Sequence, residues 1–431
     1  MIACYLLDPI TRNMPFCPSL PFMPYEPTPA DQYTRMANQR WMEKVAKLNP
    51  QVKIRDMVIP ATHDAGTYGI SINNFFYFAA KTQRLDIYHQ LVAGSRSLDL
   101  RYGSKGSCRE DVYIFHGPYA GPQYKEVFEQ INRFITENPN EFLVVLIQQE
   151  NAINADQKDY LLELIRAYLT PKAITKSDST TWFKIDKVTI GQIVQKHKNY
   201  FVLADSHLCL LSADQQSRDL ADYEAMGIYE SSIFYHSSWA NTNTTAALWE
   251  YELKKIGEMK SIKNTLVCTQ TMLTQQTTKQ DIESYIIGTE SLRLDHFTKM
   301  LKKDQNMANF FIDNIGTQSF NYIELDYIDY SPELVKYLIG LNFPHALTVI
   351  SAKADDVDVT KKVAGLVSRG RVVYIPNFKQ NLKLDFTPRE FSIEFMYQGD
   401  SVTTTRKFAT EDIGHEFVLT YMDISKSLKK R

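Results

Sequence analysis

Ionisable side chains gather in three short segments of the first third of the chain, each beside an apolar run. His63 and Asp64 lie in PATHDAGTYG, Asp99 and Arg101 lie in SRSLDLRYG, and His116 follows the run VYIF. Two histidines can divide the roles of general base and general acid. An arginine can stabilise extra charge on a phosphate through paired N–H bonds. Together these residue types suit cleavage of a phosphodiester in which one imidazole accepts a proton and the other donates one.

The three segments are expected to meet because each charged group is placed at the end of a strand. In SRSLDLRYG a period of two puts Asp99 and Arg101 on one face and Leu98 and Leu100 on the other. Barrels of parallel strands carry their active sites at the carboxyl ends of those strands. Three consecutive strand ends would therefore bring their ionisable groups to one rim. The plainer alternatives are loop-capping residues in the first segment and a structural ion pair in the second.

Strand-like and helix-like patterns alternate along most of the chain, which predicts parallel strands joined by helices. We expect a (β/α)8 TIM-type barrel of the α/β class, allowing for irregular strands. Between Ser206 and Lys260 the pattern leaves the fifth and sixth strands unplaced. The seven expected strands are MVIPATHD, SRSLDLRYG, VYIFHG, FLVVLIQQE and residues 200–204, 265–269 and 309–313.

Composition divides the chain into three parts. Seven of the 17 prolines fall within the first 29 residues, so residues 1–30 are expected to form an extended arm. Residues 31–343 would form the barrel domain. From residue 344 to residue 431 strand-like runs are separated by turns rather than helices, which predicts an antiparallel β-sandwich accessory domain.

The overall composition argues against several classes of protein. The formal net charge of −2 gives no basic field to attract nucleic acid. The five cysteines lack the spacing of a zinc site or a disulfide framework, which favours a reducing compartment. No basic start precedes a sustained apolar run at the N-terminus, and no segment reaches the ~18 apolar residues of a membrane span. We therefore expect a soluble or peripheral protein.

Motifs within residues 41–150 resemble the X region of the phosphatidylinositol-specific phospholipase C family, most closely its bacterial, metal-independent branch. In chain order they are WM, IPATHDAGTY, TQRLDIYHQLVAGSRSLDLR, HGP and ENPNEFLVVLIQQE. Because the cysteines favour a reducing compartment, we expect a cytoplasmic location. The resemblance implies an enzyme that binds a membrane surface transiently and cleaves a phospholipid into diacylglycerol and a cyclic phosphorylated headgroup. It implies neither metal nor cofactor, because Arg101 falls where calcium-dependent members carry an acidic ligand. Asp99 would position Arg101.

The same resemblance implies roles for the other site residues. His63 would be the base that activates the inositol 2-hydroxyl, and His116 the acid that protonates the leaving glycerol oxygen. Asp64 would assist His116. Asp313, in NFFIDNIG, would orient His63 as in a catalytic triad.

The match departs from the family where the headgroup would bind. Gln148 and Asp205 stand where the bacterial enzymes have basic residues facing inositol. Tyr235 and Trp239 could wall the headgroup pocket, with packing in the core as the alternative. The aromatic run NNFFYFAA is either a membrane-touching rim helix or core.

These departures leave three functions open. The first is cleavage of a phosphoinositide-like lipid, and the second is the same chemistry on a different phosphodiester lipid. The third is a catalytically retired scaffold that binds lipid or glycan. The C-terminal part is similar to a small β-domain found appended to unrelated proteins, and it could bind a protein or glycan partner.

Overall fold

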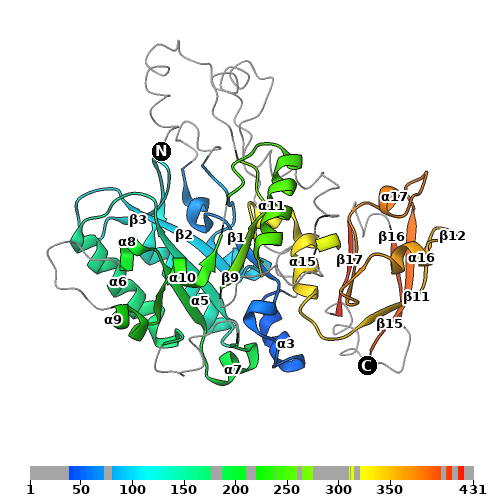
Figure 1. Cartoon of the computed structure of the whole chain (residues 1–431), viewed down its shortest axis with the longest axis horizontal. Helices are drawn as coiled ribbons and strands as arrows, with labels where there is room; N and C mark the ends of the chain where they lie inside the picture. The colour runs from blue at the N-terminus through cyan, green and yellow to red at the C-terminus, as the bar shows by residue number, and fades with distance from the viewer. Residues whose placement is uncertain are drawn as a thin grey trace, which may run out of the picture.

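A computed structural model of the chain shows an α/β barrel followed by an antiparallel β-domain (Figure 1). The structure describes residues 38–71, 80–175, 187–209, 220–237, 239–259, 265–274, 310, 312–314, 321–398, 404–409 and 416–421. The expected N-terminal arm and the aromatic run at residues 73–79 lie outside the described residues.

Within the described residues, the barrel has eight parallel strands whose order around the sheet follows their order in the chain. Hydrogen-bonded neighbours run from β7 through β6, β5, β2, β1, β10 and β9 to β8. Because β10 pairs with β1, the last strand joins the first, and the ends of the sheet are β7 and β8. The predicted TIM-type barrel is therefore confirmed, with its irregularity at β7 and β8. The strands are β1 (Ile59–Thr62), β2 (Ser97–Ser104), β5 (Leu143–Gln149), β6 (Tyr200–Ala204), β7 (Ile228–Glu230), β8 (Tyr235–His236), β9 (Leu266–Gln270) and β10 (Tyr322–Leu325).

The two strands that the sequence left unplaced are β7 and β8. They have only three and two residues, and the four-residue helix α10 (Ser231–Phe234) connects them. Elements this short carry too few residues to show a period of two. Their brevity explains why periodicity could not find them.

Two of the expected barrel strands are wrong. The run VYIFHG forms β3 (Val112–His116), which pairs antiparallel with β2 and with β4 (Tyr119–Gln123) and so forms a hairpin beside the barrel. The expected strand at residues 309–313 is also wrong. Residues 312–314 are helical, and the strand that enters the barrel is β10.

Amphipathic helices cover the outside of the sheet. In α5 (Tyr124–Glu137) the buried residues Tyr124, Val127, Phe128 and Ile131 recur at helical spacing. A capping box at Asn154 starts the helix that packs beside it. The described helices of the barrel are α3 (Trp41–Leu48), α4 (Ile87–Ala93), α5, α6 (Ala155–Tyr168), α7 (Ile190–Gln195), α8 (Ser206–Cys209), α9 (Leu220–Ala225), α10, α11 (Thr245–Met259) and α15 (Pro332–Gly340).

A buried ion pair fixes α3 to the barrel. The Arg96 Nε lies 2.7 Å from a Glu141 carboxylate oxygen, and that carboxylate also accepts bonds from the first-turn amides of Met42 and Glu43. Both members of the ion pair are buried. Because hydrogen bonds satisfy the buried carboxylate, the pair anchors the entry to the barrel.

The C-terminal part is an antiparallel β-domain of two sheets, as predicted. One sheet has the order β12-β11-β15-β16 and the other β13-β14-β17. Its own core contains Phe391, Ile393 and Phe395. The elements are β11 (Leu347–Ala354), β12 (Val357–Asp358), α16 (Thr360–Ala364), β13 (Val367–Ser368), β14 (Val372–Ile375), α17 (Phe378–Asn381), β15 (Glu390–Tyr397), β16 (Thr404–Ala409) and β17 (Phe417–Leu419).

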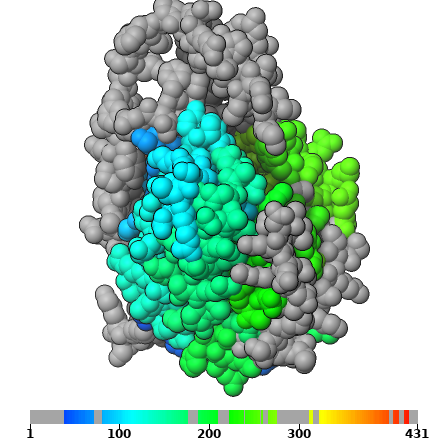
Figure 2. Space-filling model, turned by 90° about the vertical axis from the view of Figure 1, so that its left-hand side faces the viewer, coloured from blue at the N-terminus to red at the C-terminus, as the bar shows by residue number. Residues whose placement is uncertain are grey.

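The smaller sheet of the β-domain packs against α15, which lies between the two units in Figure 1. Tyr337 on this helix stacks on Tyr374 at 4.7 Å between ring centroids, and its hydroxyl lies 2.9 Å from the Ser368 Oγ. Seen from the barrel side, the described surface is formed by residues of the barrel domain (Figure 2). No helix in the described ranges is long and apolar enough to span a bilayer.

Candidate active site

His63 lies immediately after β1, and backbone and side-chain bonds hold it there. Its amide donates to the Leu325 carbonyl at the end of β10, at 3.2 Å. Its Nδ1 lies 2.8 Å from the Asp326 Oδ1. The next residue, Asp64, has a left-handed backbone (φ 43°), and this conformation turns the chain sharply into a short 3-10 helix. The turn leaves the other ring nitrogen of His63 facing the barrel mouth.

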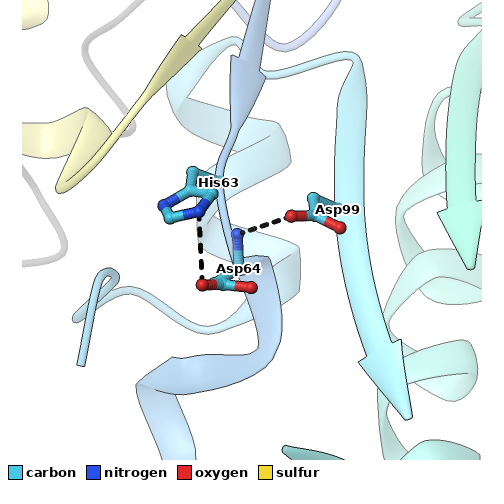
Figure 3. A group of neighbouring side chains, drawn as sticks. All are labelled: His63, Asp64 and Asp99. Carbon is cyan, nitrogen blue, oxygen red and sulfur yellow. Dashed lines mark hydrogen bonds and ion pairs between the residues drawn. The ribbon is translucent and has the colours of Figure 1, made fainter. Parts of the chain in front are cut away.

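Arg101 and the two carboxylates predicted with it converge on that second nitrogen. The Arg101 Nη2 lies 3.2 Å from the His63 Nε2, and its Nε lies 2.6 Å from the Asp64 Oδ1. Asp99 lies 3.2 Å from the same guanidinium and accepts a 3.4 Å bond from the Asp64 amide. Figure 3 shows His63 and Asp64 at the end of one strand and Asp99 on the next.

His116 reaches the same group although β3 is not a barrel strand. β3 runs back along the carboxyl half of β2, with Val112 opposite Ser104 and Ile114 opposite Tyr102. This reversal returns His116 toward Arg101. The His116 Nδ1 lies 2.7 Å from the Ala80 carbonyl and 3.6 Å from the Asp64 Oδ2.

The buried carboxylates set the protonation of the site. Burial alone would lower the pKa of His63, but Asp64 and Asp326 outweigh burial and raise that pKa to about 10. Burial opposes ionisation of Asp64, yet Arg101 and the two histidines hold the Asp64 pKa below its usual value. Burial and the nearby Asp64 charge raise the pKa of Asp99. Asp64 is thus the carboxylate that stays ionised.

The two protonation states of His63 present different groups to a substrate. When the imidazole is neutral with its proton on Nδ1, Nε2 can accept a proton from a hydroxyl group. When it is an imidazolium, Nε2–H faces the Asp64 Oδ2 at 3.3 Å. The arrangement can therefore accept, hold and return one proton.

The expectation that Asp313 orients His63 is wrong. Asp313 lies in a helical turn and is exposed, and it acts on the pKa of Tyr337. The partner of His63 is Asp326, just past the end of β10. The signal that could have found it is the buried run YIEL followed by a carboxylate, the same strand-end pattern that identified the other residues.

Glu150 is a second residue that the motifs did not single out. It follows β5, accepts a 2.8 Å bond from the Gly117 amide and lies 3.6 Å from the Arg101 Nη1. Deeper in the barrel, Glu324 is buried on β10. Burial and the nearby Asp99 raise its pKa to about 7.

The four residues expected to contact the headgroup have different surroundings. Gln148 is paired in register with Arg101 at the barrel rim. The Asp205 carboxylate accepts bonds from the Tyr102 hydroxyl and from the Gln149 and Leu208 amides.

The two aromatic residues differ in burial. Tyr235 is buried against Tyr322, with ring centroids 6.2 Å apart. Trp239 is 54% exposed and its Nε1 lies 2.6 Å from the Thr274 Oγ1. Gln148 is therefore the only one of the four headgroup candidates that is paired in register with Arg101.

One group of side chains among the described residues has the geometry to hold a metal ion. Ligand atoms of His63, Asp64 and Asp99 all lie within 4.8 Å of one another. Arg101 already contacts both carboxylates, so a positive charge occupies the position that a cation would take. This donor set therefore fits a guanidinium better than an added ion.

Known proteins match part of this chain in sequence. No family model matches the chain. The 1-phosphatidylinositol phosphodiesterase of Listeria monocytogenes is 29% identical over 154 residues, which cover 34% of this chain and 45% of that protein. A PI-PLC X domain-containing protein 1 of Danio rerio is 28% identical over 170 residues, covering 33% and 55%. The chain therefore spans about half the length of these relatives.

A solved structure matches a larger part of this chain than the sequence relatives do. The phosphatidylinositol-specific phospholipase C from Listeria monocytogenes matches with a TM-score of 0.52 at 17% identity, covering 70% of this chain and 98% of the other. At that identity the match shows the fold. The resemblance to the phosphatidylinositol-specific phospholipase C X-domain family, expected from the motifs, is thus confirmed in both sequence and fold.

Proposed function

We propose that this protein is a metal-independent phospholipase C-type phosphodiesterase that acts on a phosphatidylinositol-like lipid. The observation that carries the proposal is the position of Asp64 between Arg101 and the two histidines. Its carboxylate oxygens lie 2.6 Å from the Arg101 Nε, 3.3 Å from the His63 Nε2 and 3.6 Å from the His116 Nδ1. One buried carboxylate thereby gathers a base, an acid and a phosphate-binding group.

The reaction follows from these positions. His63 reacts in its neutral form, which is the minority form at neutral pH because its pKa is raised to about 10. In that form it takes the proton of a headgroup hydroxyl next to the phosphate, and the hydroxyl oxygen attacks phosphorus. The bond from phosphorus to the glycerol oxygen breaks, and His116 in its charged form donates a proton to that oxygen. The products are a cyclic phosphate and diacylglycerol. Arg101 stabilises the extra negative charge on the phosphate oxygens as it develops.

Asp326 supports the base in this scheme. It accepts the Nδ1–H bond of His63, which keeps Nε2 as the reacting nitrogen and stabilises the imidazolium that forms. Asp99, two residues earlier on β2, accepts a bond from the Arg101 guanidinium and so holds it in place. Because the site must reach a phospholipid in its bilayer, we also propose transient binding to a membrane surface.

A second candidate is the same reaction on a different phosphodiester lipid. It is favoured by Gln148, which is uncharged where a basic residue is expected. The Asp205 carboxylate is committed to bonds with its own fold. The reacting group is complete in either case, and the headgroup contacts decide between the two candidates.

A panel of vesicles tests both candidates. Wild-type protein is incubated with phosphatidylinositol and with other glycerophospholipids, and release of water-soluble phosphate ester is measured. We expect release that His63→Ala or His116→Ala abolishes. The control is His89→Ala, which removes a histidine paired with Asp86 at 2.7 Å on α4, outside the site.

Three outcomes are informative. Release from phosphatidylinositol supports the first candidate, and release only from another lipid supports the second. Lipid binding without release from any vesicle would overturn the enzyme proposal in favour of a binding scaffold. Full activity in both histidine variants would overturn the assigned roles.

A further inference from the structure

The segment at residues 80–83 contacts both histidines of the site through atoms that no step of the reaction uses. The Ala80 carbonyl lies 2.7 Å from the His116 Nδ1. The Thr82 hydroxyl lies 3.0 Å from the His63 carbonyl and 3.1 Å from the Asp64 carbonyl. Gln83, the last residue of the segment, has the most extensive contacts.

Gln83 links the ends of two barrel strands through its side chain. Its Nε2 donates to the His63 carbonyl at 3.2 Å and to the Leu325 carbonyl at 2.8 Å. Its Oε1 accepts from the Ile328 amide at 3.2 Å. These bonds hold the backbone of His63 on one side and the backbone on both flanks of Asp326 on the other.

Burial makes this link rigid. Gln83 is fully buried, so water cannot replace its bonds. Both N–H groups and the carbonyl oxygen of the amide are used. Its backbone amide also donates to the Thr67 hydroxyl at 3.2 Å, which fixes the start of the side chain. Few rotamers can satisfy all these partners at once.

We propose that Gln83 is a positioning residue that sets the geometry of the His63–Asp326 pair. The proposal rests on the proposed reaction, in which that pair is the base. A side chain that binds both backbones fixes the distance between the two strand ends, and hence the 2.8 Å contact between the two side chains. Errors of about 1 Å in such a contact can cost on the order of 100-fold in rate.

The protonation of His63 gives a readout that does not need turnover. The charged groups around His63 are Asp64 on its own loop, Asp99 and Arg101 on β2, Glu324 on β10 and Asp326 after β10. If Gln83 is removed, Asp326 is free to move away while Asp64 and Asp99 stay tied to Arg101. Loss of one carboxylate partner lowers the His63 pKa from about 10.

The experiment compares Gln83→Leu with a matched control, Asn321→Leu. Asn321 is buried, and its amide donates to two carbonyls, those of Ile54 and Met57, both at 2.8 Å. It lies at the opposite end of β10 from the site. Each variant therefore removes a buried amide that joins β10 to another segment, and only one of them is near His63.

Two quantities are measured on each variant. The pKa of His63 is followed by nuclear magnetic resonance of protein labelled in histidine, with the signal assigned through a His63→Ala sample. The values of kcat and KM are measured on the lipid that the wild type cleaves. For Gln83→Leu we expect a lower His63 pKa and a fall in kcat on the order of 10- to 100-fold, with little change in KM. Asn321→Leu should change neither.

An unchanged His63 pKa and kcat in Gln83→Leu would overturn the proposal and leave Gln83 with a purely structural role. If Gln83→Leu is recovered unfolded, Gln83→Asn replaces it, because the shorter amide cannot reach both carbonyls. If the wild type cleaves no lipid, the proposed function fails while the pKa comparison still tests the positioning role.

Discussion

Asp64 explains why so many charges can share a small buried space. Its ionised carboxylate lies within 3.6 Å of Arg101 and both histidines, so each charge has an opposite partner. An unpaired buried charge would cost several kcal/mol, whereas here opposite charges lie next to one another. The backbone of Asp64 is left-handed, a conformation that is unfavourable for most residues other than glycine, and it directs the side chain into the site.

The first prediction separates Asp326 from Asp313. Asp326→Asn should lower kcat on the order of 1,000-fold or more, because the base loses its orienting carboxylate. It should also move the acid limb of the pH profile of kcat/KM to lower pH, because Asp326 is one of the two carboxylates that raise the His63 pKa to about 10. Steady-state kinetics across pH 5 to 10.5 measures both effects.

Asp313→Asn is the control for that experiment. Its side chain is exposed and lies outside the site. It should leave both the rate and the profile unchanged. A large loss in this variant, with none in Asp326→Asn, would restore the assignment that the sequence suggested.

The second prediction concerns the buried Glu324. Its pKa in the folded state, about 7, is above the usual value of 4.5, so the folded chain holds a proton that the unfolded chain releases. The contribution of Glu324 to the stability of the folded state therefore falls as the pH rises from about 4.5 to about 7. The ionised carboxylate destabilises the fold most above pH 7. Glu324→Gln should stabilise the protein by up to about 3 kcal/mol at pH 8 and by much less at pH 5. Melting temperatures at the two pH values test this, and an equal change at both would contradict it.

At the scale of the elements, the β3–β4 hairpin delivers His116, and a close backbone contact fixes the hairpin against the loop after His63. A Cβ on Gly66 would lie 2.4 Å from the Ile114 side chain, and one on Gly121 would lie 2.9 Å from the Gly66 carbonyl oxygen. Glycine at these positions lets loop and hairpin meet. Packing of the hairpin against this loop therefore fixes the position of His116 relative to His63.

The third prediction follows from this contact. Gly66→Ala should push β3 away, cost about 1 to 3 kcal/mol of stability and reduce kcat through displacement of His116. The control is Gly257→Ala in the exposed part of α11, where nothing lies within 4 Å of the new Cβ. That variant should gain up to about 1 kcal/mol in stability, with kcat unchanged. Equal effects of the two changes on kcat would refute the role of the contact.

The sequence predicts strand ends better than strand pairing. β1, β2, β5, β6 and β9 follow from apolar runs bounded by polar residues, and the ionisable groups at the ends of the first two follow with them. The run VYIFHG has the same composition, yet it pairs antiparallel because a turn, not a helix, separates it from β2. His116 nevertheless lies 3.6 Å from the Asp64 Oδ2, because of a strand reversal that the sequence does not reveal.

The sequence could not predict Asp326 as the partner of His63 for a different reason. Two strand-like runs, NFFIDNIG and YIELDY, each end in a carboxylate, and period alone cannot decide which enters the barrel. The decision depends on the register between β10 and β1, which sets Glu324 opposite Ala61 and carries the chain on to Asp326 beside His63. Register between strands more than 200 residues apart is a tertiary property.

For the whole molecule, the barrel and the β-domain share a packed boundary at α15. Tyr337 is buried there between the barrel core and Tyr374, and a Cβ on Gly340 would lie 2.6 Å from the Thr420 side chain. Such close packing makes the two units depend on each other for stability.

The fourth prediction tests this dependence. Tyr337→Ala should cost about 3 to 5 kcal/mol, because it removes a large buried ring from the boundary. Tyr337→Phe keeps the ring and loses only the bond to Ser368, so it should cost about 1 kcal/mol. Urea midpoints of the three proteins provide the comparison. Similar midpoints for wild type and Tyr337→Ala would mean that the boundary contributes little to stability.

The central claim is that His63 and Arg101 cleave a lipid phosphodiester without a metal ion. The most direct test is release of water-soluble phosphate ester from mixed phosphatidylinositol vesicles, with and without excess chelator, by the wild type and by His63→Ala. We expect the wild type to release phosphate ester whether or not chelator is present, and we expect His63→Ala to abolish that release. Release that chelator abolishes, or that persists in His63→Ala, would contradict the central claim.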